Sequence, residues 1–173
     1  MLTVAASGLF GGLRPTEKPT VPVIAVHTAF DGGPWTVTVN RALTLKTLEP
    51  LKKTEKAGDR WVAVRVRMEI NADETWNRID DVIRLPGVKG LRTVEPSEFY
   101  LVRDESLLVR ELQPGIPEEV AFLWQQDGSV PRPEAMDVEL WGMTHRKSSL
   151  TDMIEWLDSG PRALVLDVPV EDR

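Results

Sequence analysis

The strongest constraint on the fold is strict alternation between residues 60 and 70, which read RWVAVRVRMEI. Every second position from Val62 onward is apolar, and charged side chains occupy most positions between them. A helix would distribute the apolar side chains around its surface, whereas a strand places all of them on one face. The segment therefore predicts a core strand that buries Val62, Val64, Val66, Met68 and Ile70, each stabilising the fold by about 1.5–3 kcal/mol before conformational entropy is counted.

Several other segments share this two-residue period and are separated by glycine- and proline-containing turns such as 31–34 and 113–115. A series of short strands with no helices between them is typical of a sandwich rather than of an α/β fold. We therefore predict an all-β, immunoglobulin-like antiparallel β-sandwich of about 7–9 strands. The further expected strands cover 21–27, 35–40, 81–85, 98–102, 107–112, 119–125, 136–141 and 164–170.

Two segments depart from the strand pattern. The polar stretch near 73–79 predicts a short helical turn that begins at Asp73. In the stretch 151–158, Met153, Trp156 and Leu157 follow helical spacing, and Gly160 and Pro161 follow it. We expect a short helix there, with an irregular strand as the alternative.

The chain divides into three parts. Residues 1–13 are apolar and uncharged, residues 14–22 form a proline-rich linker, and residues 23–171 form the sandwich domain. A membrane-spanning helix needs about 20 apolar residues, so the first segment is too short to span alone. We interpret it as the end of a membrane anchor or as an apolar tail that docks on the domain or a partner. The expected location is extracytoplasmic, either membrane-anchored or secreted.

Composition argues against several function classes. The chain has no cysteine, which excludes disulfides and thiol chemistry, and only two histidines. The net charge is −6, whereas nucleic-acid binders usually carry a basic surface. Ser148 and Ser149 follow His145 closely, but no nucleophile-elbow motif accompanies them. We therefore predict no catalytic residue, no metal site, no cofactor, no nucleic-acid partner and no enzymatic activity.

Six tryptophans against one tyrosine is an unusual ratio. Core packing is the expected role for most of them. Trp61 and Trp141, however, lie on strand faces opposite to the valine-rich faces, and an exposed tryptophan beside an arginine can form a binding hot spot. By the same alternation, His145 shares a face with Trp141. The candidate binding surface therefore contains Trp61, Arg65, Arg67, Trp141 and His145.

Three segments, GDRWVAVRVRMEI, LQPGIPEEVAFLW and ALVLDVPV, resemble the exported immunoglobulin-like, telokin-like domains of actinobacteria, a family of unknown function similar to a small secreted mycobacterial antigen. The resemblance spans roughly residues 34–170. It implies a sandwich fold and export, and it supplies no catalytic residues. A lipobox cysteine is lacking, which argues against lipoprotein anchoring. The matching positions are Trp61, Val62, Val64, Val66, Pro114, Gly115, Val120 and Phe122.

Three hypotheses follow. The first is a non-catalytic, membrane-tethered, extracytoplasmic immunoglobulin-like domain that binds a protein or envelope partner, as an accessory subunit of a membrane or transport complex. The second is a secreted module that binds a ligand or carbohydrate through exposed tryptophans. The third, a hydrolase built around His145, has the weakest support because no orienting group or elbow accompanies the histidine.

Overall fold

The computed structural model describes residues 20–48, 52, 54, 56–108 and 111–173. In this part of the chain the secondary structure is ten strands and one 3-10 turn, η2 (Ile79–Asp81), with no α-helix. No helix here is long and apolar enough to cross a membrane. The strands are β1 (Val23–Ile24), β2 (Ala29–Asp31), β3 (Trp35–Leu45), β4 (Arg60–Ile70), β5 (Ile83–Arg84), β6 (Glu98–Leu101), β7 (Asp104–Leu108), β8 (Glu118–Gln126), β9 (Ala135–Lys147) and β10 (Ile154–Asp172).

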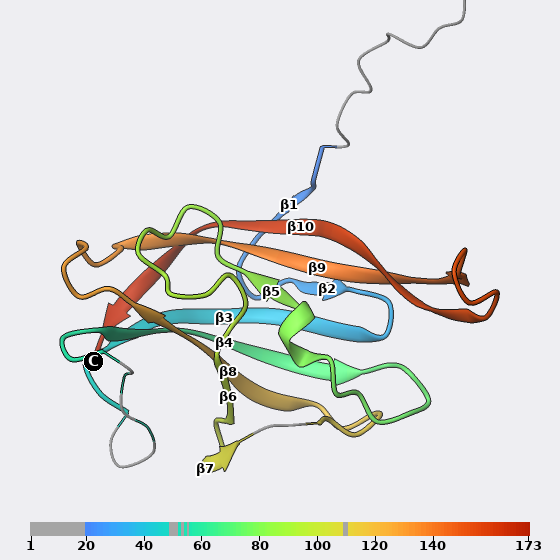
Figure 1. Ribbon diagram of the computed structural model, residues 1–173, viewed down its shortest axis with the longest axis horizontal. Helices are drawn as coiled ribbons and strands as arrows, with labels where there is room; N and C mark the ends of the chain where they lie inside the picture. Colours follow the sequence, from blue (N-terminus) through green and yellow to red (C-terminus); the bar gives the residue numbers. More distant parts are fainter. Residues whose placement is uncertain (1–19, 49–51, 53, 55, 109–110) are drawn as a thin grey trace, which may run out of the picture.

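The ten strands form one hydrogen-bonded sheet that curls over on itself to make the two layers of a sandwich (Figure 1). The strand order is β5-β9-β10-β3-β4-β8-β6-β7, with β1 beside β10 and β2 beside β3. The long strand β10 forms the corner, because it pairs with β9 in one layer and with β3 in the other. The predicted all-β sandwich is confirmed, and seven of its strands have four or more residues.

The pairing is not entirely antiparallel. β10 runs parallel to β3 through Val170–Ala42 and its neighbours, and β1 runs parallel to β10 through Val23–Leu164 and Ile24–Val165. These parallel pairs were not predicted, because alternation within a strand carries no information about the direction of its neighbours. The strand expected over 21–27 is correspondingly short, with pairing to β10 confined to two residues.

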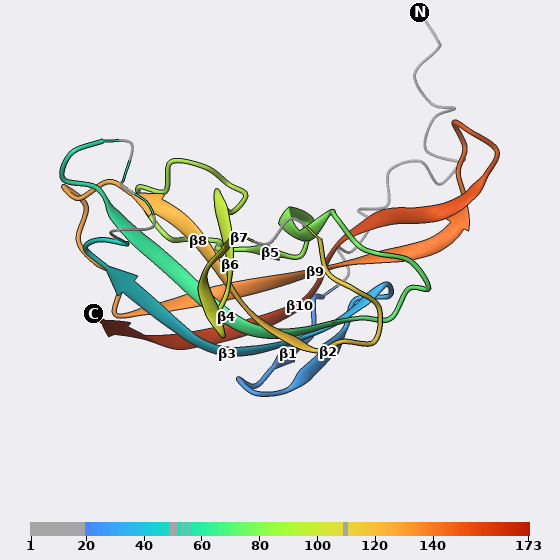
Figure 2. The same cartoon turned by 90° about the horizontal axis from the view of Figure 1, so that it is seen from below.

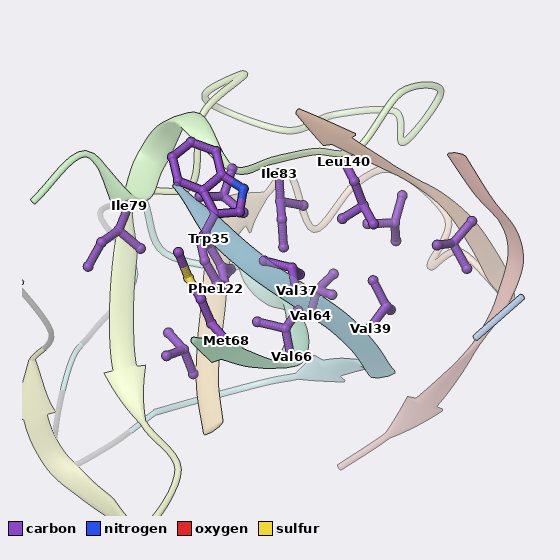
Figure 3. Close-up of a cluster of buried hydrophobic side chains, with 14 of the residues drawn as sticks. Trp35, Val37, Val39, Val64, Val66, Met68, Ile79, Ile83, Phe122 and Leu140 are labelled. Carbon is purple, nitrogen blue, oxygen red and sulfur yellow. The ribbon is translucent and has the colours of Figure 1, made fainter. Parts of the chain in front are cut away.

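Strand β4 places Val62, Val64, Val66, Met68 and Ile70 in the core at 0–1% exposure, as predicted. In Figure 3 Val64, Val66 and Met68 lie close to Val37 and Phe122. The second layer supplies Ile83 and Leu140 to the same cluster. Trp35 packs edge-to-face on Trp76, with 5.3 Å between ring centroids.

The opposite face of β4 is also buried, which alternation alone did not predict. Trp61 and Ala63 pack there against Leu43 from β3 and Leu123 from β8, which stand opposite Ala63 in the strand register and share its face of the sheet. Partly buried side chains, including Tyr100, border this second cluster. Strand β4 is therefore apolar on both faces near its start and has a solvent-facing side only toward Arg65 and Arg67.

Both predicted helices are wrong. The residues expected to form a turn near 73–79 instead include Trp76, whose backbone exchanges two hydrogen bonds with Leu112 at 3.0 and 2.9 Å. The helical turn begins only at Ile79. The stretch 151–158 is a tight turn followed by β10, which confirms the alternative of an irregular strand. Pairing with β9 outweighs the helical spacing, and Asp152 adopts a left-handed φ of 64° that no α-helix accepts.

The alternation expected over 164–170 is interrupted. Ala163 and Val165 are the buried residues, whereas Leu166 is 41% exposed. The register with β9 shifts between Val165 and Val168, where Asp167 adopts a φ of 51°. This bulge inserts an extra residue, so the buried parity changes and Val168 points into the core.

Candidate binding surface

The five predicted surface residues do not form one surface. Trp61 is fully buried in the second cluster, so its assignment to a surface is wrong: apolar side chains, including Leu48 and Tyr100, pack on the face on which it lies. Arg65 and Arg67 lie on β4, whereas Trp141 and His145 lie on β9 in the other layer. Arg65 is committed to an ion pair with Glu119 at 2.8 Å, and Arg67 is exposed.

Trp141 lies at a groove of about 720 Å3 between the connection that follows β5 and the strand β9. This groove, called the Trp141 groove below, contains two arginines, three carboxylates and several apolar side chains. Its lining comprises Arg84, Leu85, Pro86, Val88, Gly90, Leu91, Arg92, Thr93, Val94, Glu95, Glu139, Trp141 and Asp158.

Arg84 is held over Trp141 by acceptors on several sides. Strand β5 pairs Arg84 with Glu139 of β9, which brings the guanidinium carbon to 5.2 Å from the Trp141 ring centroid. The guanidinium donates to the backbone oxygens of Asp80 and of Ile83, the latter at 2.9 Å. It also lies 3.3 Å from Glu95 and 3.9 Å from Asp81. Arg84 therefore keeps one orientation, with a side chain only 11% exposed.

The indole of Trp141 is fixed from its other end. Its Nε1–H donates to Glu139 Oε2 at 3.3 Å, and the side chain is half-buried. One ring face carries the Arg84 guanidinium, so the pair presents a cation–π stack at the groove rather than a bare ring.

The opposite wall of the groove is anchored by Arg92. Its guanidinium binds Asp59 through two hydrogen bonds of 2.9 and 2.8 Å and lies 3.2 Å from Asp127. The hydrogen bond from Arg92 holds the pKa of the Asp59 carboxyl below its usual range, and the same pairing raises the pKa of Arg92. The hydroxyl and backbone N–H of Ser129 lower the pKa of Asp127.

Val94 stands at the rim of the groove and is 69% exposed. Its backbone is nevertheless anchored, because the buried Trp124 indole donates to the Val94 carbonyl at 3.2 Å. Thr93 Oγ1 donates to the Glu95 carbonyl at 2.7 Å. An exposed aliphatic side chain is thus presented from a fixed loop beside the Arg84–Trp141 stack.

His145 belongs to a different region, at the outer part of β9. Its ring stacks on Trp156 of β10 with centroids 4.8 Å apart and an interplanar angle of 30°. Ser148 Oγ accepts the backbone N–H groups of Leu150 and Thr151 at 3.3 Å each, and so caps the turn that follows β9. The Ser148 hydroxyl is therefore engaged in hydrogen bonds of the turn, and one face of the His145 ring is covered by the Trp156 indole.

Among the other hollows in the described part of the molecule, two lie away from the Trp141 groove. A polar one of about 750 Å3 lies at the end of the sandwich near Asp59 and Asp172. Both of its arginines are engaged: Arg60 donates to two backbone oxygens of the 128–130 loop, and Arg132 lies 2.8 Å from Asp172. A small apolar one of about 140 Å3 lies over the second cluster, beside Tyr100. Burial raises the pKa of the Tyr100 hydroxyl.

No cluster of three or more His, Asp or Glu residues suited to a metal ion occurs among the described residues. Sequence reasoning found Trp141 but missed Arg84, Arg92 and Val94. These three come from separate positions in the loop-rich stretch 84–95, and their convergence depends on the pairing of β5 with β9. Arg84 is directly followed by Leu-Pro-Gly, and this sequence context does not indicate a binding site.

No family model matches the chain, and no curated protein matches it. Among solved structures, the chain is similar to an uncharacterised β-sandwich protein from Clostridium difficile 630, with a TM-score of 0.54 and 11% sequence identity. The match covers 88% of this chain and 98% of that one. At this identity the likeness shows the fold, a β-sandwich, and it carries no activity or ligand.

Proposed function

We propose that this chain is a non-catalytic, extracytoplasmic domain that is tethered to a membrane through its N-terminal segment and binds a protein partner of the cell envelope. The proposal includes the role of an accessory subunit in a membrane or transport complex. One observation carries it: the Arg84–Trp141 stack, held in an open groove beside the exposed Val94. The Trp141 groove is the proposed partner site.

The residue types at the groove are those that dominate protein–protein binding energy. Tryptophan and arginine are enriched among binding hot spots, and an apolar residue at their side helps to exclude water. Arg84 is already immobilised by Glu95 and by backbone acceptors. Because its side chain has few rotamers to lose, binding would cost less conformational entropy than it would for a free arginine.

The tether is supported by the sequence. Residues 1–13 are apolar and uncharged, and three prolines lie within 14–22. Proline-rich linkers act as semi-rigid spacers between a domain and its anchor. The resemblance of the strand motifs to exported immunoglobulin-like domains of actinobacteria supports the same location.

Carbohydrate binding through exposed tryptophans is not the function we favour. All six tryptophans lie in the described part of the chain. Four are buried at 6% exposure or less, Trp141 carries Arg84 on one face, and Trp156 carries His145. A sugar-binding platform uses an open aromatic face, and here both partly exposed indoles have a face already occupied.

The proposal is tested in cells of the native host. The photo-crosslinking residue p-benzoyl-phenylalanine replaces Val94 in the full chain, and the matched control carries it at Ile116, which is 51% exposed and lies outside the Trp141 groove. After irradiation, membranes and the soluble fraction are separated and probed for the chain. We expect membrane recovery for both variants and a discrete crosslinked product from position 94 alone.

Each part of the proposal can fail separately. Recovery of the full chain in the cytoplasmic fraction would contradict the tether. Equal crosslinking from positions 94 and 116, or none from 94, would contradict the Trp141 groove as the partner site. Replacing Arg84 and Trp141 by alanine should reduce the position-94 product, because the stack supplies the expected binding hot spot.

A further inference from the structure

The hairpin formed by β9 and β10 continues beyond the body of the sandwich. Figure 2 shows its outer part projecting as a two-stranded ribbon, which Figure 1 also shows. Residues 144–147 pair with 154–157, and in the described structure these residues pair with no other strand. We call residues 144–157 the arm. An isolated two-stranded ribbon has little stability of its own, so a projecting ribbon is expected to gain stability from a contact outside the domain.

The end of the arm is apolar. Leu150 is 95% exposed, Ile154 is 68% exposed and Met153 is 61% exposed. These three residues, called the tip below, account for three of the seven strongly exposed large apolar side chains in the described chain. Single exposed apolar residues are ordinary on a protein surface, whereas a group at the end of a projection marks a contact with another apolar phase.

The turn that carries the tip is pre-organised. Besides the two bonds to Ser148 Oγ, Thr151 Oγ1 donates to Glu155 Oε1 at 2.8 Å, and this bond lowers the pKa of the Glu155 carboxyl. Lys147 pairs with Asp152 at 2.8 Å, and Arg146 stands opposite Glu155 in the strand register. The charges beside the tip therefore compensate one another, which lowers the cost of bringing the tip to an apolar medium.

The side chains behind the tip suit the boundary between lipid and water. The Trp156–His145 stack lies on the same ribbon face as Ile154, two cross-strand pairs nearer the body. Trp156 packs against Gly33, where φ is +96° and an added Cβ would lie 2.9 Å from the indole. Indole rings are enriched at membrane interfaces, and Lys or Arg stems there extend so that the charge reaches water.

The direction of β1 shows on which side of Val23 the arm lies. β1 runs parallel to β10 and the Leu164 N–H donates to the Pro22 carbonyl at 2.9 Å, so Pro22 lies beside β10 on the side of Val23 that is nearer the arm. From Leu164, the strand reaches Ile154 in about 33 Å. The nine residues 14–22 span at most about 32 Å when fully extended. The apolar segment 1–13 and the tip can therefore reach the same plane.

We propose that the tip of the arm inserts into the interfacial region of a lipid bilayer and gives the domain a second membrane contact. The inference rests on the proposed function insofar as the tether brings the domain to a membrane. We infer a bilayer rather than a protein as the occupant, because the three exposed apolar side chains lie at the end of a projection and residues 1–13, the proposed membrane tether, are apolar and uncharged. The compensated charges predict insertion that does not require anionic lipid.

The chain has no cysteine, so a single introduced cysteine gives a unique label. Leu150→Cys in the full chain is coupled to the environment-sensitive dye NBD and mixed with vesicles of phosphatidylcholine, with or without phosphatidylglycerol. The matched control is Leu166→Cys, in the body part of β10 and 41% exposed. We expect the NBD emission at position 150 to move to shorter wavelength and to rise in intensity with both vesicle types, and the emission at position 166 to stay unchanged.

Several results would overturn the proposal. In the first, the chain binds to vesicles but the dye at position 150 still reports an aqueous environment. This result would refute the membrane contact of the arm and leave the proposed tether intact. In the second, the NBD emission shifts only when phosphatidylglycerol is present. In the third, the emission shifts without vesicles and the shift grows with protein concentration, which would indicate that a second copy of the chain binds the tip. In unlabelled chain, the triple change Leu150→Ser, Met153→Ser and Ile154→Ser should lower the vesicle-bound fraction, and Leu166→Ser should not.

Discussion

At the scale of single residues, Arg92 links two regions that are far apart in the sequence. It binds Asp59, at the start of β4, through two hydrogen bonds and contacts Asp127, which follows β8. The side chain of Asp59 is only 5% exposed. Removing one partner of such a pair leaves the other charge buried without a counter-charge. The resulting loss of folding free energy exceeds the net contribution of the intact pair.

Asp59→Asn should lower the free energy of unfolding by about 1–3 kcal/mol at neutral pH. The folded-state pKa of Asp59 lies below the ordinary value of 3.8, so the stabilisation is fully present above that value and is lost as pH falls through the lowered folded pKa. The gap in stability between wild type and variant should therefore narrow below about pH 4. Urea unfolding at pH 7 and pH 3 measures it, with the exposed Asp73→Asn as control. An equal difference in unfolding free energy between wild type and Asp59→Asn at both pH values would contradict a stabilising role of the ionised Asp59.

At the scale of elements, the β9–β10 hairpin combines a packed half and a free half. In the body, Leu140 is fully buried between the layers, whereas in the arm Ile154 faces solvent. The two residues belong to strands that pair with each other, β9 and β10. Their energetic difference comes from the second layer, which covers Leu140 and leaves Ile154 exposed.

Leu140→Ala should destabilise the protein by about 2–5 kcal/mol, because it leaves a cavity in a close-packed core. Ile154→Ala should change stability by less than about 0.5 kcal/mol, because the side chain is already exposed. Thermal or urea unfolding of both variants compares them directly. Comparable losses in the two variants would mean that the arm packs on the body in solution.

The elements also show where sequence reasoning ends. Alternation found β4 and its five core residues, since a half-buried strand leaves a two-residue period in the chain. Alternation failed in β10, where the bulge at Asp167 reverses the buried parity. Helical spacing failed over 151–158, where pairing with β9 favours a strand. The groove was found only through Trp141, because Arg84 reaches it through a two-residue strand too short to leave a pattern. Burial of Trp61 depends on side chains from other segments, including Leu48 and Tyr100, and alternation within β4 does not reveal them.

At the scale of the whole molecule, the two apolar clusters lie on opposite faces of the same strand. Val62 and Val64 belong to the main cluster, while Trp61 and Ala63 belong to the second one. Neither cluster can lose its packing while β4 stays in place, and β10 joins the layers through continuous hydrogen bonding. The sandwich should consequently behave as one cooperative unit, although it has two separate apolar regions.

Urea unfolding should therefore show one transition, with the same midpoint by tryptophan fluorescence and by far-UV circular dichroism. The fluorescence reports both clusters, because Trp61 lies in the second and Trp35, Trp76 and Trp124 lie in the main one. Leu43→Ala removes a side chain of the second cluster and should lower both midpoints equally. If the second cluster unfolded by itself, this variant would separate the two curves, with fluorescence changing at lower urea. Coincident curves in both proteins would show that the curled sheet transmits the loss of packing from one face of β4 to the other.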